Sequence, residues 1–210
     1  MDLANLLNDC PLVAILRGIK PDEMDAVSDA LVEAGLRIIE VPLNSPEPLR
    51  SIERLARRHG ETVMVGAGTV MTPEDVIDVR DAGGELIVMP HMDTEIVDEA
   101  KAEGMTCVPG VATPTEAFQA LTAGADALKL FPAEAMPPTI VKAWRAVFPS
   151  DTIMIAVGGI SAANIGSYAA AGTAGFGIGS SIYSPGKTAP DVSASARELL
   201  SAWKEIAAGG

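Results

Sequence analysis

The sequence predicts a single (β/α)8 barrel (a TIM barrel) over residues 1–210, with an extra short helix at its N-terminus. Two observations lead to this prediction. Eight short apolar runs alternate with amphipathic, Ala-rich stretches, and each run has the length of a buried parallel strand. The runs start roughly 20–26 residues apart, and eight such units in about 200–250 residues are typical of this barrel. The chain has 210 residues.

The predicted strands end in Gly, Pro or polar residues, and the stretches between them carry helix start and end signals. The predicted strands are residues 13–19, 37–44, 62–70, 85–91, 105–111, 127–132, 152–160 and 175–182. The clearest predicted helices are residues 24–35, 75–83, 115–124, 162–172 and 194–210. Residues 1–9 are expected to form the extra helix, on the barrel floor. An open doubly wound sheet is the alternative, but no GxGxxG follows the first run.

Composition narrows the classes of partner. The net charge of −13 and the pI near 4.5 argue against nucleic acid or an anionic membrane as the main partner. Cys10 and Cys107 are the only cysteines, and with two distant histidines they predict neither a disulfide framework nor a metal site. The N-terminus has no signal-peptide pattern and no apolar run is long enough to span a membrane. We therefore expect a cytoplasmic location.

One lysine has unusual surroundings. Lys129 lies inside an apolar run, whereas the other lysines lie in helical or loop stretches. Burial disfavours the ammonium form, so a lysine there is either paired or neutral. A neutral amine in a dry pocket is the nucleophile that forms a Schiff base with a ketone. The residues leave two interpretations: a Schiff-base lysine at the barrel rim, or a structural pair with a buried carboxylate.

Three further polar side chains interrupt or end predicted strands. Glu40 shares one strand face with Asn44, and if that face points inward, Glu40 is suited to a proton shuttle beside Lys129. A structural Glu40–Lys129 pair is the alternative. The Arg17 guanidinium is suited to binding a substrate carboxylate or phosphate, or to pairing with Glu40. Thr69 ends the third strand, where its hydroxyl can hold a substrate carboxylate or serve the fold alone.

Two glycine-rich strand ends predict a phosphate site. Gly158-Gly159 ends the seventh run and Gly179-Ser180 ends the eighth, and in such barrels these two strand ends form the usual phosphate seat. We expect a helix N-terminus to follow each of them, with Ser161 opening the first helix. Backbone N–H groups can hold an anion in a net-acidic protein. Phe131, on the face of Lys129, would form an apolar wall. Tight turns alone are the alternative role for the glycines.

Together these segments resemble a known family, the class I aldolases that cleave 2-dehydro-3-deoxy-6-phospho sugar acids. The segments that carry the resemblance are LRGI (16–19), IEVPLNSPEPL (39–49), VGAGTV (65–70), PGVATPTEAF (109–118), ALKLFPAE (127–134), AVGGIS (156–161) and GIGSSIY (177–183). The resemblance implies a metal-independent Schiff-base mechanism without an organic cofactor, and a homotrimer. It implies a phosphorylated keto-deoxy sugar acid as substrate, with pyruvate and D-glyceraldehyde 3-phosphate as products.

The resemblance also implies site residues. It assigns the imine to Lys129 and acid/base chemistry to Glu40. It assigns substrate contacts to Arg17, Thr69, Gly158, Gly159, Gly179 and Ser180. The sequence Met89-Pro90-His91 departs from the family pattern, so the role of His91 stays open.

Arg17 in LRGI is a feature of the galactonate-type branch of this family. The gluconate-type enzyme usually has an Arg in the segment matching PLNSP, which is absent here, and a Thr where Val157 stands in AVGG. Three alternatives remain at this point. The chain could act on the gluconate epimer, it could cleave 4-hydroxy-2-oxoglutarate or decarboxylate oxaloacetate without needing a phosphate, or it could be a non-catalytic barrel that binds phosphosugars.

Overall fold

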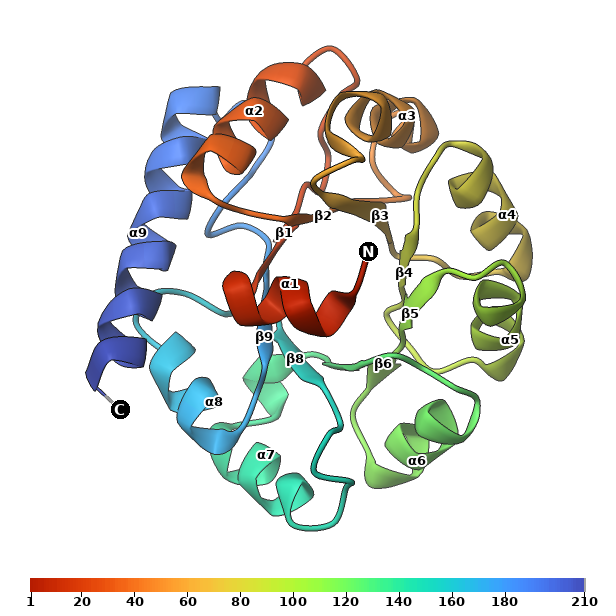
Figure 1. The fold of residues 1–210 in the computed structure, drawn as a ribbon, viewed down its shortest axis with the longest axis vertical. Helices are drawn as coiled ribbons and strands as arrows, with labels where there is room; N and C mark the ends of the chain where they lie inside the picture. The colour runs from red at the N-terminus through yellow and green to blue at the C-terminus, as the bar shows by residue number, and fades with distance from the viewer. Residues whose placement is uncertain (210) are drawn as a thin grey trace.

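Parallel strands form a barrel surrounded by helices in the computed structural model, which describes residues 1–209 (Figure 1). The strands are β1 (Leu12–Ile15), β2 (Ile38–Pro42), β3 (Met64–Gly68), β4 (Leu86–Val88), β5 (Thr106–Val108), β6 (Gly110–Val111), β7 (Leu128–Leu130), β8 (Met154–Val157) and β9 (Gly175–Ile178). The helices are α1 (Leu3–Asp9), α2 (Met24–Ala34), α3 (Pro48–His59), α4 (Pro73–Asp81), α5 (Thr94–Ala102), α6 (Pro114–Thr122), the 3-10 turn η1 (Ala133–Ala135), α7 (Pro138–Arg145), α8 (Ile165–Ala171) and α9 (Ala189–Gly209). The predicted (β/α)8 barrel is confirmed.

The fifth predicted strand is divided in two at Pro109, so nine strand segments form eight strand–helix units. β5 pairs with β4, and β6 pairs with β7. Pro109 has no backbone N–H, which interrupts the ladder, but its carbonyl still accepts a 2.9 Å hydrogen bond from the Lys129 N–H. Because β5 and β6 lie on either side of one residue, the barrel closes at this point.

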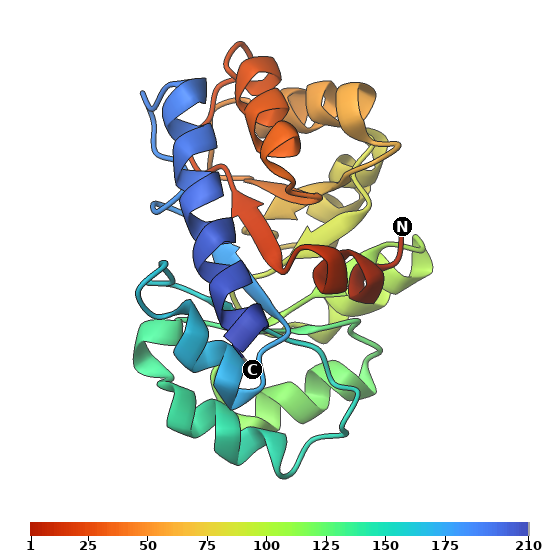
Figure 2. The same ribbon diagram turned by 60° about the vertical axis from the view of Figure 1, so that its left-hand side comes forward.

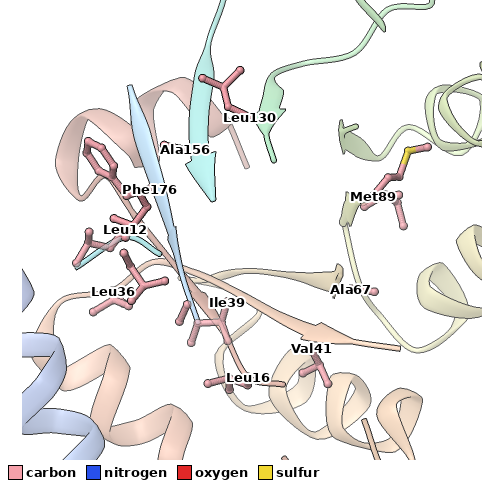
Figure 3. Packing of buried hydrophobic residues seen from close by; sticks show 14 of the residues in the cluster. Leu12, Leu16, Leu36, Ile39, Val41, Ala67, Met89, Leu130, Ala156 and Phe176 are labelled. Carbon is pink, nitrogen blue, oxygen red and sulfur yellow. The ribbon is translucent and has the colours of Figure 1, made fainter. Parts of the chain in front are cut away.

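Alternation along the strands separates two apolar layers. On β2, Ile39 and Val41 point outward to the helices, and Ile38 and Glu40 belong to the interior. Figure 3 shows part of the outer layer, with Ile39 near Leu36 and Leu16, and Phe176 of β9 near Leu12. Glu40 therefore lies on the inward face, which is the condition that its predicted role beside Lys129 requires.

Helix α1 covers one end of the barrel. In Figure 1 it lies across the middle of the ring, and Figure 2 shows it beside the start of β1. Its buried Leu3 and Leu7 belong to the inner apolar cluster, with Val13, Ile38 and Met64 among their partners. The extra N-terminal helix is confirmed, and it closes the floor.

Two predicted helix starts show the expected capping chemistry. The hydroxyls of Thr72 and Thr113 each accept a hydrogen bond from the third helical N–H, and the carboxylates of Asp75 and Glu116 accept one from the backbone N–H of the cap residue. Proline occupies the first position of both helices.

Among residues 1–209, no helix has the length and hydropathy needed to cross a membrane.

Candidate active site

A cleft of about 480 Å3 opens at the carboxyl ends of the strands. Its lining contains six of the predicted site residues: Arg17, Phe131, Gly158, Gly159, Gly179 and Ser180. A smaller cavity of about 20 Å3 lies in the barrel interior and is lined by the two predicted catalytic residues, Glu40 and Lys129. Ile15, Val157 and Gly177 line both spaces, so the two buried groups lie next to the cleft floor.

Glu40 and Lys129 enter the barrel from opposite sides. Glu40 is on β2 and Lys129 on β7, and these residues are 2% and 5% exposed. Within residues 1–209 no Glu40–Lys129 ion pair forms within 4.0 Å. Glu40 Oε2 is buried without a hydrogen-bond partner. The direct structural pair left open by the sequence does not form, and a buried oxygen remains free to accept or donate a proton.

Burial shifts the pKa of each group in the direction that favours its neutral form. It raises the pKa of Glu40 to about 7, and the positive charges of Lys129 and Arg17 and the nearby Gly68 N–H offset only part of this rise. Burial also lowers the pKa of Lys129, where Glu40 opposes the shift and Arg17 adds to it. Burial in this site therefore weakens the ammonium form of Lys129 and gives the Glu40 carboxyl a pKa of about 7.

Glycine makes room for the Glu40 carboxylate. A Cβ at Gly68 would lie 2.1 Å from Glu40 Oε2 and 2.4 Å from Oε1. Real Cβ atoms do not approach other atoms so closely, so any side chain at this position would displace the carboxylate. The VGAGTV segment thus contributes space on the inner face, a role that sequence reasoning did not assign to Gly68.

Arg17 lies with Thr69 and Asn44 at the ends of three adjacent strands. Its Nη1 donates to Asn44 Oδ1 at 2.6 Å, and both of its terminal nitrogens lie 3.5 Å from Thr69 Oγ1. Arg17 therefore bonds to neutral groups, not to Glu40. Thr69 has a φ of 57°, which is rare for a β-branched residue and is a form of strain found at functional sites. The Asn44 contact escaped the sequence prediction, because the residue was placed only on the Glu40 face.

The side chains around Lys129 and the glycines also converge. Lys129 Nζ lies 4.6 Å from the centre of the Phe131 ring, in agreement with the expected apolar wall. Gly158 and Gly159 have φ values of 109° and 64°, so they form a left-handed turn. Glu134 packs against this turn: a Cβ at Gly158 would lie 2.3 Å from Glu134 Oε2. Sequence reasoning missed Glu134, although it lies in the ALKLFPAE segment.

The predicted helix N-termini at the phosphate seat are wrong in position. Helix α8 begins at Ile165, four residues after Ser161, because Asn164 Oδ1 caps the Ser161 N–H at 2.9 Å and holds a turn there. After β9, Gly179 starts another turn, and α9 begins only at Ala189. The segments that follow Gly158-Gly159 and Gly179 are therefore turns, and Ser180 also lines the cleft.

The other candidate groups of the chain lie apart from the cleft lining. The carbonyl of His91 accepts a hydrogen bond from the Gly110 N–H, and His91 Nδ1 is buried without a partner. Over residues 1–209, no cluster of three or more His, Cys, Asp or Glu side chains has the spacing of a metal site.

A (β/α)8 barrel with a buried amine and a buried carboxyl beneath an open cleft is equipped for chemistry on a carbonyl carbon. The chain belongs to the KDPG and KHG aldolase family, whose model matches residues 3–195. It is therefore an aldolase, a carbon–carbon lyase of the class I type.

Individual relatives agree with this assignment. The chain is 46% identical over 199 residues to a probable 2-dehydro-3-deoxy-6-phosphogalactonate aldolase of Rhizobium meliloti (strain 1021), covering 95% of this chain and 94% of the relative. It is 44% identical over 195 residues to the 2-dehydro-3-deoxy-6-phosphogalactonate aldolase of Escherichia coli (strain K12), with 93% and 95% covered. A solved structure described as native KDPGal superposes with a TM-score of 0.93 at 43% identity, covering 94% of this chain and 96% of the other.

Proposed function

We propose that the protein cleaves 2-dehydro-3-deoxy-6-phosphogalactonate reversibly to pyruvate and D-glyceraldehyde 3-phosphate. The observation that carries this proposal is the buried Lys129 amine, with its pKa lowered, which lines the same small cavity as the Glu40 carboxyl with its free oxygen. The relatives that cover nearly the whole chain and are named for this substrate support the choice of substrate.

The first step is formation of the imine. The neutral Lys129 amine attacks the C2 ketone, and the carbinolamine loses water to give a protonated imine. The protonated Glu40 carboxyl, with a pKa near 7, supplies the proton for the departing hydroxyl. The positive charge then created on the imine nitrogen favours the ionised form of Glu40.

The second step is cleavage of the C3–C4 bond. Glu40, acting through a water molecule, takes the proton of the C4 hydroxyl. The C3–C4 bonding electrons move to the imine nitrogen, which gives an enamine and releases D-glyceraldehyde 3-phosphate. Protonation at C3 and hydrolysis of the imine then release pyruvate and restore Lys129. The imine serves as the electron sink, a task that a metal ion performs in other lyases.

The two ends of the substrate have separate seats in this proposal. Arg17 and Thr69 orient the C1 carboxylate, since Arg17 is near enough to Lys129 and Glu40 to influence the pKa of both. The turns at Gly158-Gly159 and Gly179-Ser180 hold the 6-phosphate through backbone N–H groups and the Ser180 hydroxyl. Phe131 shields the enamine from water.

The assembly follows from the family resemblance, and the location follows from the cysteine usage and the N-terminal sequence. We propose that residues 1–210 act as one domain, that three copies assemble into a homotrimer, and that the enzyme works in the cytoplasm. Sedimentation velocity tests the trimer, and a species of one or two chains at assay concentrations would contradict it.

The decisive experiment compares substrates on the wild-type protein. Pyruvate release is measured by a coupled assay with the galactonate and gluconate C4 epimers and with the dephosphorylated galactonate compound. We expect the highest kcat/KM on the phosphorylated galactonate compound. Preference for the gluconate epimer would transfer the assignment to the sister activity, and equal rates without the phosphate would favour a 4-hydroxy-2-oxoglutarate aldolase. Binding without turnover would favour a phosphosugar-binding barrel.

A further inference from the structure

Arg17 differs from the arginines of the outer helices in its partners. Arg54, Arg58 and Arg80 each contact a carboxylate within 4.0 Å. Within residues 1–209, Arg17 contacts no carboxylate at that distance, and its hydrogen-bond acceptors are the neutral oxygens of Asn44 and Thr69. Its side chain is therefore anchored while its charge is left uncompensated.

We propose that Asn44 is a positioning residue that holds the Arg17 guanidinium in place for the substrate carboxylate and, by being uncharged, keeps it available. The proposal rests on the function proposed above and adds to it the residue that makes the carboxylate seat selective for an anion. The neutrality of Asn44 matters as much as its hydrogen bond, because an acidic residue at the same position would occupy Arg17 itself.

The backbone around Asn44 is built to hold this contact. The Gly18 N–H, next to Arg17, donates to the buried Ser45 Oγ at 2.9 Å, and the Ser45 N–H donates back to the Pro42 carbonyl at 2.9 Å. The first bond ties the loop after β1 to the loop after β2, and the second closes a turn that contains Asn44. The side chains of residues 17 and 44 are therefore held close together by two joined loops.

The third loop joins through the adjacent strand. The Leu43 N–H donates to the Gly68 carbonyl at 2.8 Å, which fixes the residue before Asn44 against the residue before Thr69. Thr69 holds its hydroxyl near both Arg17 nitrogens despite a φ of 57°. The ends of β1, β2 and β3 thus meet at the Arg17 guanidinium, and its two side-chain partners, Asn44 and Thr69, are both uncharged.

The electrostatic consequence concerns the keto acid. Pyruvate carries one negative charge, and hydrogen bonds between ionised partners are about twice as strong as neutral ones. A carboxylate at position 44 would take the place of the ligand carboxylate on Arg17, and it would add like-charge repulsion. A missing side chain at position 44 would leave the charge in place and only loosen its orientation.

The test measures imine formation with pyruvate alone, in the whole protein, by sodium borohydride trapping and mass spectrometry. The pyruvate concentration for half-maximal trapping is determined for wild type, Asn44→Ala and Asn44→Asp. We expect an increase of about tenfold or more for N44D, the loss associated with a charged hydrogen bond, and only about two- to fivefold for N44A. Asn5→Asp adds the same charge on α1, at the opposite end of the barrel, and is expected to match the wild type.

Which of N44A and N44D needs the higher pyruvate concentration decides whether the neutrality of Asn44 matters or only its hydrogen bond. If Asn44 were only a hydrogen-bond acceptor, N44A would be the worse variant, because aspartate keeps an acceptor at the same position. That order, or no change in either variant, would overturn the proposal. A wild type that traps no pyruvate would overturn the proposed function first, and the inference with it. Thermal melting of each variant, with Asn44→Ser as a second neutral replacement, shows whether a poor result reflects loss of the fold.

Discussion

The two ends of the barrel interior are built on opposite principles. At the floor, Leu3 and Leu7 of α1 bury apolar surface against inward strand residues such as Met64. At the mouth, the inward residues include Glu40 and Lys129, both nearly fully buried, with the strained Thr69 close by. Burial of apolar side chains at the floor stabilises the fold. Burial of ionisable groups at the mouth costs part of that stability and favours the neutral forms of these groups. Groups that stabilise the fold and groups that carry the chemistry therefore lie at different ends of the same strands.

The largest expected effect is at Lys129. Lys129→Met keeps the length of an apolar side chain and removes the amine, so turnover and borohydride trapping with pyruvate should both disappear. Mass spectrometry of the trapped wild type should place the added pyruvyl group on Lys129. Because a costly buried amine is removed, the melting temperature should not fall. If K129M still traps pyruvate, another amine forms the imine. The chemistry would then not be located at the mouth of the barrel.

Glu40→Gln should separate imine formation from cleavage. The amide keeps the shape of the carboxyl but cannot exchange a proton, and general acid–base groups contribute about 100- to 10,000-fold to rates. We expect kcat to fall within that range, whereas pyruvate should still be trapped at long incubation times. Steady-state assays and trapping on the same preparation provide the comparison. Unchanged turnover would reassign Glu40 to a structural role.

Glu40 should also set the alkaline limb of the pH profile. The proposed reaction starts from the protonated carboxyl, and this form is lost as the pH rises through its pKa of about 7. We expect kcat/KM, which reports the free enzyme, to decline above about pH 7, and the residual activity of E40Q to lack this limb. A wild-type profile that is flat between pH 5 and 8 would contradict the role of Glu40 as the titrating group.

The same shift should appear in stability. The pKa of Glu40 is raised above its ordinary value of 4.5, so in this range the folded state binds the proton more tightly than the unfolded chain does. The contribution of Glu40 to the free energy of unfolding is therefore present at low pH and is lost as the pH rises from about 4.5 to about 7. Urea titrations of wild type and E40Q at several pH values measure it. The difference between the two should change in favour of E40Q across that window.

The smallest effect on chemistry is expected at the floor. Leu7 is 4% exposed, and Leu7→Ala should lower the free energy of unfolding by about 2–5 kcal/mol, as for other buried leucines. At temperatures where the variant stays folded, kcat should be unchanged, because Leu7 is remote from the cleft. Leu6→Ala, at a partly buried position of the same helix, is the matched control and should cost less. A large loss of kcat in folded L7A would show that the two ends are coupled.

Part of the site could be predicted because the signals are local. Lys129 and Glu40 are charges within apolar runs, and the two-residue period of a strand shows which neighbours share their faces. The structure then shows that these faces point inward. The same period and the spacing of the runs predicted the barrel. The division of strand five at Pro109 and the late start of α8 at Ile165 were missed, since each depends on a hydrogen-bonding detail within a few residues.

The sequence by itself determined the barrel, the closing helix and the identity of the two buried ionisable groups, because burial patterns repeat along the chain and need no knowledge of long-range contacts. Only the tertiary structure decided which neighbours those groups have. Arg17 could pair with Glu40 or with Asn44 and Thr69, and Glu134 could lie anywhere around η1. These choices depend on distances between side chains from different strands, which are set by strand register and loop conformation when the barrel closes.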